Sequence, residues 1–255
     1  MLHTMTRLLL SPLAWLLMAW AATAGAQTLV VAVDSSLHPV LKEVAKDFEA
    51  NRSGVKVQWV VGAPGALLDQ LAQGKPMDVW AGTDDQVVSS GLLRKLLVPN
   101  LRGVFASNHL VLVEAAAASG KPPLQRLADL ALPEVQRVAL GREASEPAGR
   151  YARQAIDTQR LWPLVQRKVV LTDDVREVLR QVATAEVDAG FVYATDAAAN
   201  PQVRVVQALQ LAAPIRHQAH VAVGGQHAAL AEAFVAHLRS PVAQAAFKSA
   251  GFELP

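Results

Sequence analysis

The sequence predicts an α/β protein built on open parallel sheets with helices on both faces. Short apolar runs, which suit buried strands, alternate along the chain with amphipathic stretches at helical spacing. The 255 residues are enough for two domains of ~100 residues each. With 52% hydrophobic and only 18% charged residues, the chain can fill two cores and does not have the composition of a disordered protein.

The first half of the chain predicts three strands that alternate with three helices. Strands are expected at 29–33, 55–61 and 77–81, and helices at 38–51, 64–73 and 84–96. Ser35 or Ser36 is placed to cap the first of these helices. Pro64 suits the first turn of the second helix, because a backbone N–H at that position has no partner within the helix.

The same alternation continues through the second half. Strands are expected at 110–113, 138–140, 169–171, 189–193, 203–206 and 219–223, and helices at 149–159, 175–186 and 230–249. The pairs Asp84-Asp85 and Asp173-Asp174 each precede a helical stretch. Aspartate caps the first turn of a helix and interacts well with its dipole, so we expect these pairs to be caps rather than acid–base groups.

Residues 1–26 predict a secretory signal peptide. Arg7 precedes an apolar run that ends at Ala22, and the small residues at 24–26 form a cleavage site after Ala26. A membrane anchor is the alternative, but the run falls short of the ~20 residues that a spanning helix needs. The sequence contains no Cys, which excludes lipid attachment at this junction and any disulfide. We therefore expect a periplasmic protein whose signal peptide is removed on secretion.

Charge and motifs exclude several classes of function. Of the 24 Lys+Arg and 22 Asp+Glu residues only one, an Arg, lies in 1–26, so the mature chain carries a formal charge of +1 and has no basic stripe for nucleic acid. It has no nucleophile elbow and no glycine-rich nucleotide-binding loop. His217 and His220, three apart on an expected strand, face opposite sides and do not suit a metal site. We expect a protein that is not an enzyme and uses no cofactor.

The candidate ligand site lies where strands end and helices begin. In open α/β sheets, ligands bind outside the carboxyl ends of the strands. Helix N-termini at these ends offer free N–H groups and a positive dipole end, which can bind an anion without Lys or Arg. Every helix needs a cap, so such residues are also expected where no ligand binds. In this chain the positions are 34–36, 62–65, 147–149, 173–175 and Tyr193.

Several motifs along the chain are similar to those of one family. They read QGKPMDVWA at 73–81, EPAGRYA at 146–152, DVR at 174–176 and DAGFVYATDA at 188–197. In their order and spacing, from Leu29 to Phe252, they resemble the periplasmic molybdate-binding proteins, the substrate-binding components of molybdate ABC transporters. The ending at 238–244 with Gly251-Phe252 is a weaker signal, because many solute-binding families end in this way.

The resemblance implies a two-lobed periplasmic binding protein in which two doubly wound sheets are joined by two crossover strands. Lobe one is expected at 27–105 plus 217–255, and lobe two at 106–216. The implied protein is a monomer that holds molybdate or tungstate between its lobes and delivers it to an ABC permease in the inner membrane, with molybdenum present only in the bound oxyanion. Carried over by motif, the ligand-binding residues are Ser36 and Tyr193 through their hydroxyls, and Ala148 and Val175 through their backbone N–H groups.

Three positions depart from the family's pattern. Pro64 stands where a ligating serine is usual and supplies neither hydroxyl nor N–H, so Ser35 or the Gly65 N–H would have to replace it. Asp34 stands where a small residue is usual, and a carboxylate ~5 Å from a dianion costs several kcal/mol unless it points away or caps the helix. His217 stands where a tyrosine is common. These changes leave open a receptor for another small solute or for an oxyanion that keeps a proton, such as hydrogen phosphate, and also a periplasmic sensor lobe.

Overall fold

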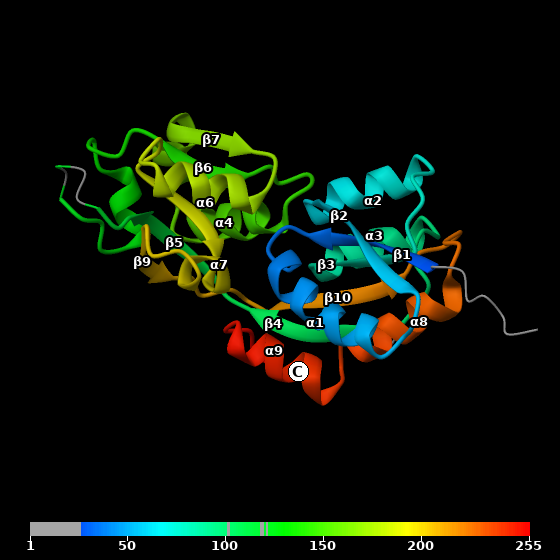
Figure 1. Cartoon of the computed structure of the whole chain (residues 1–255). Helices are drawn as coiled ribbons and strands as arrows, with labels where there is room; N and C mark the ends of the chain where they lie inside the picture. Colours follow the sequence, from blue (N-terminus) through cyan, green and yellow to red (C-terminus); the bar gives the residue numbers. More distant parts are fainter. Residues whose placement is uncertain (1–26, 101–102, 118–119, 121) are drawn as a thin grey trace, which may run out of the picture.

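The molecule has two lobes, each built on one five-stranded sheet (Figure 1). The computed structural model describes residues 27–100, 103–117, 120 and 122–255. The signal peptide expected at 1–26 therefore lies outside the described residues. Within the described part of the chain, no helix combines the length and the apolar character that crossing a membrane requires. The predicted α/β class and the two-lobed arrangement are confirmed.

The first sheet has the strand order β2-β1-β3-β10-β4. Its strands are β1 (Gln27–Asp34), β2 (Val55–Gly62), β3 (Val79–Thr83), β4 (Val104–Asn108) and β10 (Ile215–Val221). β1, β2 and β3 are parallel, whereas β10 runs antiparallel to both β3 and β4. The sheet is therefore mixed, and not wholly parallel as the first half of the sequence predicted. Its helices are α1 (His38–Ala50), α2 (Pro64–Ala72), α3 (Asp85–Leu93), α8 (Ala228–His237) and α9 (Pro241–Ser249).

The second sheet has the order β7-β6-β8-β5-β9. Its strands are β5 (Leu110–Ala115), β6 (Val138–Gly141), β7 (Val169–Thr172), β8 (Ala189–Tyr193) and β9 (Val203–Ala208). β6 is parallel to β7 and β8, while β5 is antiparallel to β8 and β9. The helices of this lobe are α4 (Pro147–Thr158), α5 (Trp162–Val165), α6 (Val175–Ala183) and α7 (Ala194–Ala198), with short 3-10 turns at Leu127–Ala131 and Gln166–Lys168.

Two chain segments join the lobes (Figure 1). β4 of the first sheet passes to β5 of the second through His109, and β9 returns to β10 through residues 209–214. The boundaries expected at 105/106 and 216/217 fall inside β4 and β10, which both lie in the first sheet. The division of the chain between the lobes at those residues stays a prediction.

Alternation along β1 separates the core of the first lobe into two layers. Leu29, Val31 and Val33 pack against α1, α8 and α9 on one face, while Ala32 packs beside Trp80 under α2 and α3 on the other. The second lobe has one continuous core of its own, formed by its five strands and by α4, α6 and α7. Each sheet is thus backed by a packed core, which positions the residues at its strand ends.

The single helix predicted at 230–249 is wrong. The structure has two helices there, α8 and α9, with a break between them. Pro241 begins α9, and the Ser240 hydroxyl caps it by accepting from the Ala243 N–H at 3.2 Å. A proline cannot continue a helix, because it has no N–H for the i−4 carbonyl and its ring clashes with the preceding turn. β4 and α7 were not predicted.

Candidate functional site

The turn after β1 places three polar residues in the interior. Ser35 and Ser36 are only 1% and 4% exposed. Neither hydroxyl forms a hydrogen bond of normal geometry in the described structure, although the Ser36 hydroxyl lies beside the Asp196 carboxyl and lowers its pKa. The prediction that one of them caps α1 is wrong, because the N-cap of α1 is Leu37 and no side chain caps it. Asp34 instead closes the turn, since its Oδ1 accepts from the Ser36 N–H at 3.1 Å. The two hydroxyls are therefore left free to bind another group.

A chain of hydrogen bonds connects Asp34 to His217 on the neighbouring strands. The Thr83 hydroxyl donates to Asp34 Oδ2 at 2.5 Å, and Thr83 Oγ1 lies 2.9 Å from His217 Nδ1. Because the Thr83 proton points to Asp34, the hydrogen of the second bond belongs to His217 Nδ1. Burial lowers the pKa of His217 to about 3, so its ring is neutral. His217 Nε2 is buried and has no partner in the described structure.

The N-terminus of α4 is held close against the end of β6. A Cβ added to Gly149 would lie 1.9 Å from the Gly141 carbonyl oxygen, so only glycine allows this approach. Pro147 begins the helix, and Glu146 caps it by accepting from the Ala148 N–H through Oε1 at 3.2 Å. Glu146 Oε2 is buried without a partner. The Ala148 N–H, expected to bind the ligand, is thus bound to a carboxyl of its own chain.

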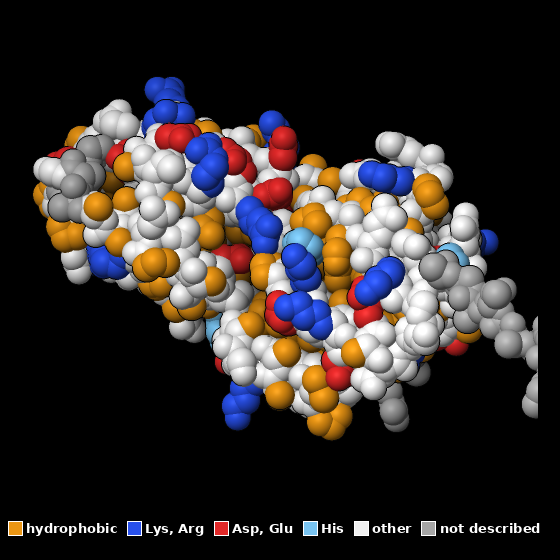
Figure 2. Space-filling model, in the orientation of Figure 1, with side chains coloured by type: hydrophobic (Ala, Val, Ile, Leu, Met, Phe, Trp, Pro, Cys, Tyr) orange, Lys and Arg blue, Asp and Glu red, His pale blue; other side chains and the backbone are white. Residues whose placement is uncertain are grey.

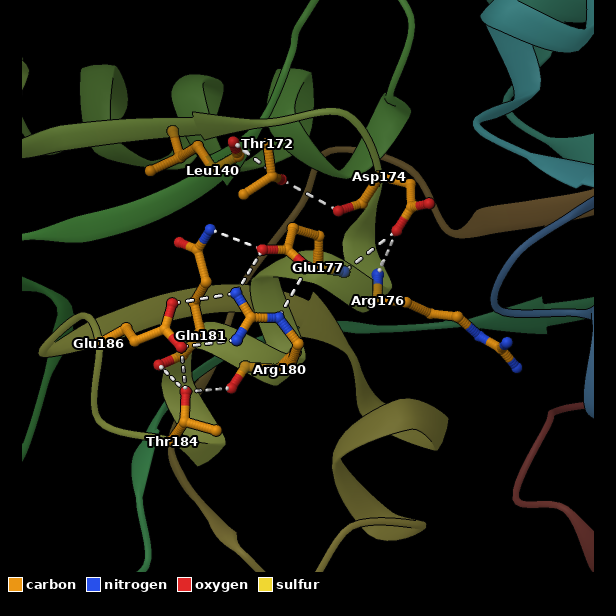
Figure 3. Close-up of polar contacts among 9 residues, drawn as sticks. All are labelled: Leu140, Thr172, Asp174, Arg176, Glu177, Arg180, Gln181, Thr184 and Glu186. Atoms are coloured by element: carbon orange, nitrogen blue, oxygen red, sulfur yellow. Dashed lines mark hydrogen bonds and ion pairs between the residues drawn. The ribbon is translucent and has the colours of Figure 1, made fainter.

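The N-terminus of α6 is fixed by its own polar contacts (Figure 3). Asp174 caps the helix by accepting from the N–H groups of Arg176 and Glu177, which confirms the capping role predicted for it. The Thr172 hydroxyl donates to the Asp174 carbonyl at 3.0 Å. Val175 is the first residue of α6 and is fully buried. One turn further along, Arg180 forms exposed ion pairs with Glu177 on the same helix and with Glu186 beyond its end.

Tyr193 brings a third hydroxyl to the interior from the other lobe. It is the last residue of β8 and is fully buried. Its hydroxyl lies beside Thr83 but forms no hydrogen bond of normal geometry in the described structure. Its ring packs edge-on against the ring of His217 on β10, with 5.9 Å between centroids. Burial and the charges of Glu146 and Asp34 raise its pKa well above the ordinary value. Tyr193 therefore lies near the carboxyls of both lobes.

Buried carboxyls give the site its electrostatic character. Burial raises the pKa of Asp34 to about 6, with a smaller effect from Asp174. Burial, together with the charge of Asp34, raises the pKa of Glu146 well above its usual range. Burial and the charge of Asp34 also raise the pKa of Asp196, at the start of α7, to about 7. The site thus combines free hydroxyls with carboxyls that resist ionisation.

Positive charge lies at the edge of the site rather than within it. Arg176 lowers the pKa of both Asp34 and Asp196 by its charge, and it has no ion-pair partner among the described residues. Figure 3 shows its side chain extending away from the Arg180 network. Arg176 and Lys42 also lower the pKa of His38, after the larger effect of burial. Lys and Arg side chains lie near the junction of the lobes on the face shown in Figure 2, with Asp and Glu side chains among them.

Two direct contacts hold the lobes together beside this site. The Gly65 N–H at the start of α2 donates to the Ser145 carbonyl at 2.9 Å, so it is not free to replace the missing serine. Arg150 Nη2 donates to Asp84 Oδ2 at 2.7 Å, so this ion pair joins the two lobes. The Arg150 side chain is 24% exposed and that of Asp84 4%.

Asp84 also caps α3, as predicted, by accepting from the N–H groups of Gln86 and Val87. No cluster of three or more His, Cys, Asp or Glu side chains suited to a metal ion occurs in the described ranges. His220 binds the Val98 carbonyl through Nδ1, while His217 faces Thr83, so the two imidazoles serve different neighbours.

Sequence reasoning missed three residues of this site: Thr83, Glu146 and the neutral His217. Glu146 carried a readable signal, since an acidic residue directly before Pro147 occupies an N-cap. It stands at the helix N-terminus that was assigned to the ligand. Thr83 and His217 are brought beside Asp34 only by the strand order β1-β3-β10, which no local pattern reveals.

The sequence and fold have counterparts among known proteins. The family of bacterial extracellular solute-binding proteins matches residues 29–253. The chain belongs to this family. It is 32% identical to the "Putative ABC transporter substrate-binding lipoprotein YvgL" of Bacillus subtilis over 88% of this chain and 86% of that one. It is 28% identical to the molybdate-binding protein ModA of Escherichia coli over 91% of each chain.

A solved structure is similar as well. The periplasmic molybdate-binding protein of Azotobacter vinelandii superposes with a TM-score of 0.74 at 25% identity, covering 89% of this chain and 99% of that one. As a member of the extracellular solute-binding family, this chain binds a solute outside the cytoplasm.

Proposed function

We propose that this protein captures molybdate or tungstate between its lobes and delivers it to an ABC permease of the inner membrane. The observation that carries the proposal is the set of buried hydroxyls of Ser35, Ser36 and Tyr193, which form no hydrogen bond of normal geometry in the described structure and come from both lobes. A buried polar group without a partner is costly, so such groups are retained where a ligand satisfies them. The relatives named for molybdate binding support the choice of anion.

The ligand-binding set is part of this proposal. Hydroxyl donors from Ser36 and Tyr193 bind the oxyanion, with Ser35 taking the place of the serine that Pro64 replaces. The N–H of Val175, at the positive end of α6, adds a backbone donor. The N–H of Ala148 joins this set when the Glu146 carboxyl turns from it toward the ligand. Each hydrogen bond to a charged acceptor contributes roughly 1.5–3 kcal/mol.

Further parts of the proposal concern how the protein works in the cell. It acts as a monomer in the periplasm after removal of its signal peptide, and as a receptor rather than an enzyme. The interlobe contacts of Arg150 and Gly65 support a hinged molecule that closes over its ligand. Small-angle scattering with and without sodium molybdate tests this directly, because ligand-driven closure reduces the radius of gyration. A molecule that neither compacts nor gains thermal stability with any oxyanion is not such a receptor.

A second candidate ligand is an oxyanion that keeps its own proton, such as hydrogen phosphate or hydrogen arsenate. The observation in its favour is the buried carboxyl of Asp34, whose pKa is about 6, because above that pH it is an ionised carboxylate that can accept a hydrogen bond from such a ligand. Facing a fully ionised dianion at ~5 Å, one carboxylate costs about 7 kcal/mol at an effective dielectric of ~20. Isothermal titration with molybdate, tungstate, sulfate and phosphate separates the two candidates, and phosphate binding that vanishes in Asp34→Ala favours the second.

A further inference from the structure

Two carboxyls from opposite lobes are enclosed together in the ligand site. Asp34 ends β1 in the first sheet and Glu146 caps α4 in the second lobe, and both are 0% exposed. Neither forms an ion pair with any residue in the described part of the chain. In solvent, water would stabilise the negative charge of each carboxylate. A carboxylate that is buried without water or a cation is strongly destabilised.

Neutral donors, not cations, surround these carboxyls. Asp34 accepts from the Ser36 N–H and the Thr83 hydroxyl, and Glu146 accepts from the Ala148 N–H through one oxygen only. A carboxyl group has about four lone-pair positions, so each of these two still has room for a proton. The hydroxyls of Ser36 and Tyr193 lie in the same site and mark where the ligand is expected. A proton on either carboxyl can therefore face the ligand.

We propose that Asp34 and Glu146 bind the oxyanion in their protonated form, so that the protein takes up a proton together with a fully ionised ligand. The inference rests on the proposed function and deepens it. In the step, the dianion enters the site and one proton from solvent attaches to the Asp34 carboxylate. The resulting O–H donates to an oxygen of the anion, and no other bond forms or breaks. A group that would repel the anion as a carboxylate becomes one of its donors.

The pKa values of Asp34 and Glu146 indicate which of the two carboxyls takes up a proton when the ligand binds. Burial holds the pKa of Asp34 at about 6, so Asp34 is ionised in the ligand-free protein above pH 6 and has to be protonated on binding. Burial and the charge of Asp34 raise the pKa of Glu146 well above its usual range, which favours the protonated form of this carboxyl. Affinity is thus constant below about pH 6 and falls about tenfold per pH unit above it, which is about 100-fold by pH 8.

Other titratable groups near Asp34 are further candidates for the proton that is taken up on binding. Tyr193 has a pKa raised well above 10 and His217 a pKa lowered to about 3, so neither titrates near neutral pH. Asp196 does titrate there, because burial raises its pKa to about 7. Asp196 is therefore the competing site for the proton that is taken up on binding. The charged or titratable groups that surround the site are His38 and Lys42 on α1, Glu146 and Tyr151 at α4, Asp174 and Arg176 at α6, Tyr193 on β8, Asp196 on α7 and His217 on β10.

Isothermal titration with sodium molybdate between pH 6 and 8.5, in buffers of different ionisation enthalpy, counts the protons taken up. The unmodified protein should take up about one proton at pH 8. Asp34→Asn is neutral at every pH, so it should take up none and bind molybdate up to about 100-fold more tightly than the unmodified protein at pH 8, with similar affinity at pH 6. Asp173→Asn, which removes an exposed carboxylate before α6, is the matched control and should behave as the unmodified protein does.

Each outcome decides the matter. Tight molybdate binding with no proton uptake and no change in affinity over this range overturns the inference and leaves the proposed function standing. Loss of molybdate binding in Asp34→Asn, in a protein whose melting shows that it is folded, also overturns it. If Asp196→Asn and not Asp34→Asn abolishes the uptake, the proton belongs to Asp196 and the inference is wrong. Absence of binding to every oxyanion at every pH instead refutes the proposed function itself.

Discussion

Replacing Tyr193 by Phe should make the ligand-free protein more stable and at the same time weaken its binding of ligand. The hydroxyl is fully buried and forms no hydrogen bond of normal geometry in the described structure, and such a group costs roughly 1–3 kcal/mol. Its removal should stabilise the ligand-free protein by about 1 kcal/mol, a rise of roughly 2–4 °C in Tm. The lost bond to a charged ligand should weaken binding by roughly 1.5–3 kcal/mol, which is about 10–150-fold.

Calorimetry measures both effects on the same sample, by thermal unfolding without ligand and by titration with sodium molybdate. Tyr151, the other tyrosine of the chain, is a matched contrast, because its hydroxyl lies beside Asp84 of the interlobe ion pair. Tyr151→Phe should lower stability by about 1 kcal/mol, since it removes a hydroxyl that contacts the Asp84 carboxylate rather than one without a hydrogen-bond partner. A Tyr193→Phe protein that is less stable than the unmodified one, or that binds molybdate equally well, refutes the reasoning.

Three further predictions follow from the packing and charges around the site. Gly149→Ala should cost about 1–3 kcal/mol of folding free energy, measured by denaturant titration, because the new methyl group meets a backbone oxygen. Gly62→Ala makes only ordinary contacts and should cost less than about 1 kcal/mol. Arg150→Met should leave the buried Asp84 carboxylate without its ion pair and weaken lobe closure by about 2 kcal/mol, which scattering would detect as a larger radius of gyration. Arg153→Met, which breaks an exposed ion pair within α4, should leave the radius of gyration unchanged. The pKa of His217 is lower in the folded protein than in the unfolded chain. Between about pH 6.5 and 3 the unfolded chain therefore binds a proton at this residue that the folded protein does not. The free energy of unfolding falls as the pH falls through this range. His217→Gln should remove this loss, about 1.4 kcal/mol per pH unit.

The regular elements were predictable because their signals are local. β1, α1 and β8 follow from apolar runs and helical spacing alone, and all expected strand positions lie within or overlap a strand of the structure. Pro64 correctly marked the start of α2. The helix break at Pro241 was equally local, and the Ser240-Pro241 pair is an N-cap followed by a first-turn proline. It was overlooked because the apolar pattern continues across the break.

The site was only partly predictable, because its chemistry depends on neighbours from distant strands. Sequence placed Ser36 and Tyr193 at strand ends, and the structure shows both buried with free hydroxyls. It could not show that Thr83 and His217 would meet Asp34, since these residues are joined only through the order of the first sheet. Whether a carboxyl is ionised depends on such contacts and on burial, which a sequence pattern does not contain.

The central claim, that an oxyanion binds between the lobes among these hydroxyls, is tested most directly by anomalous diffraction at the molybdenum edge from crystals grown with sodium molybdate. The account predicts one strong anomalous peak, within ~4.5 Å of the hydroxyl oxygens of both Ser36 and Tyr193, as two hydrogen-bonded hydroxyls around one tetrahedral anion require. A peak elsewhere on the molecule, or no peak in crystals of protein saturated with molybdate, contradicts it.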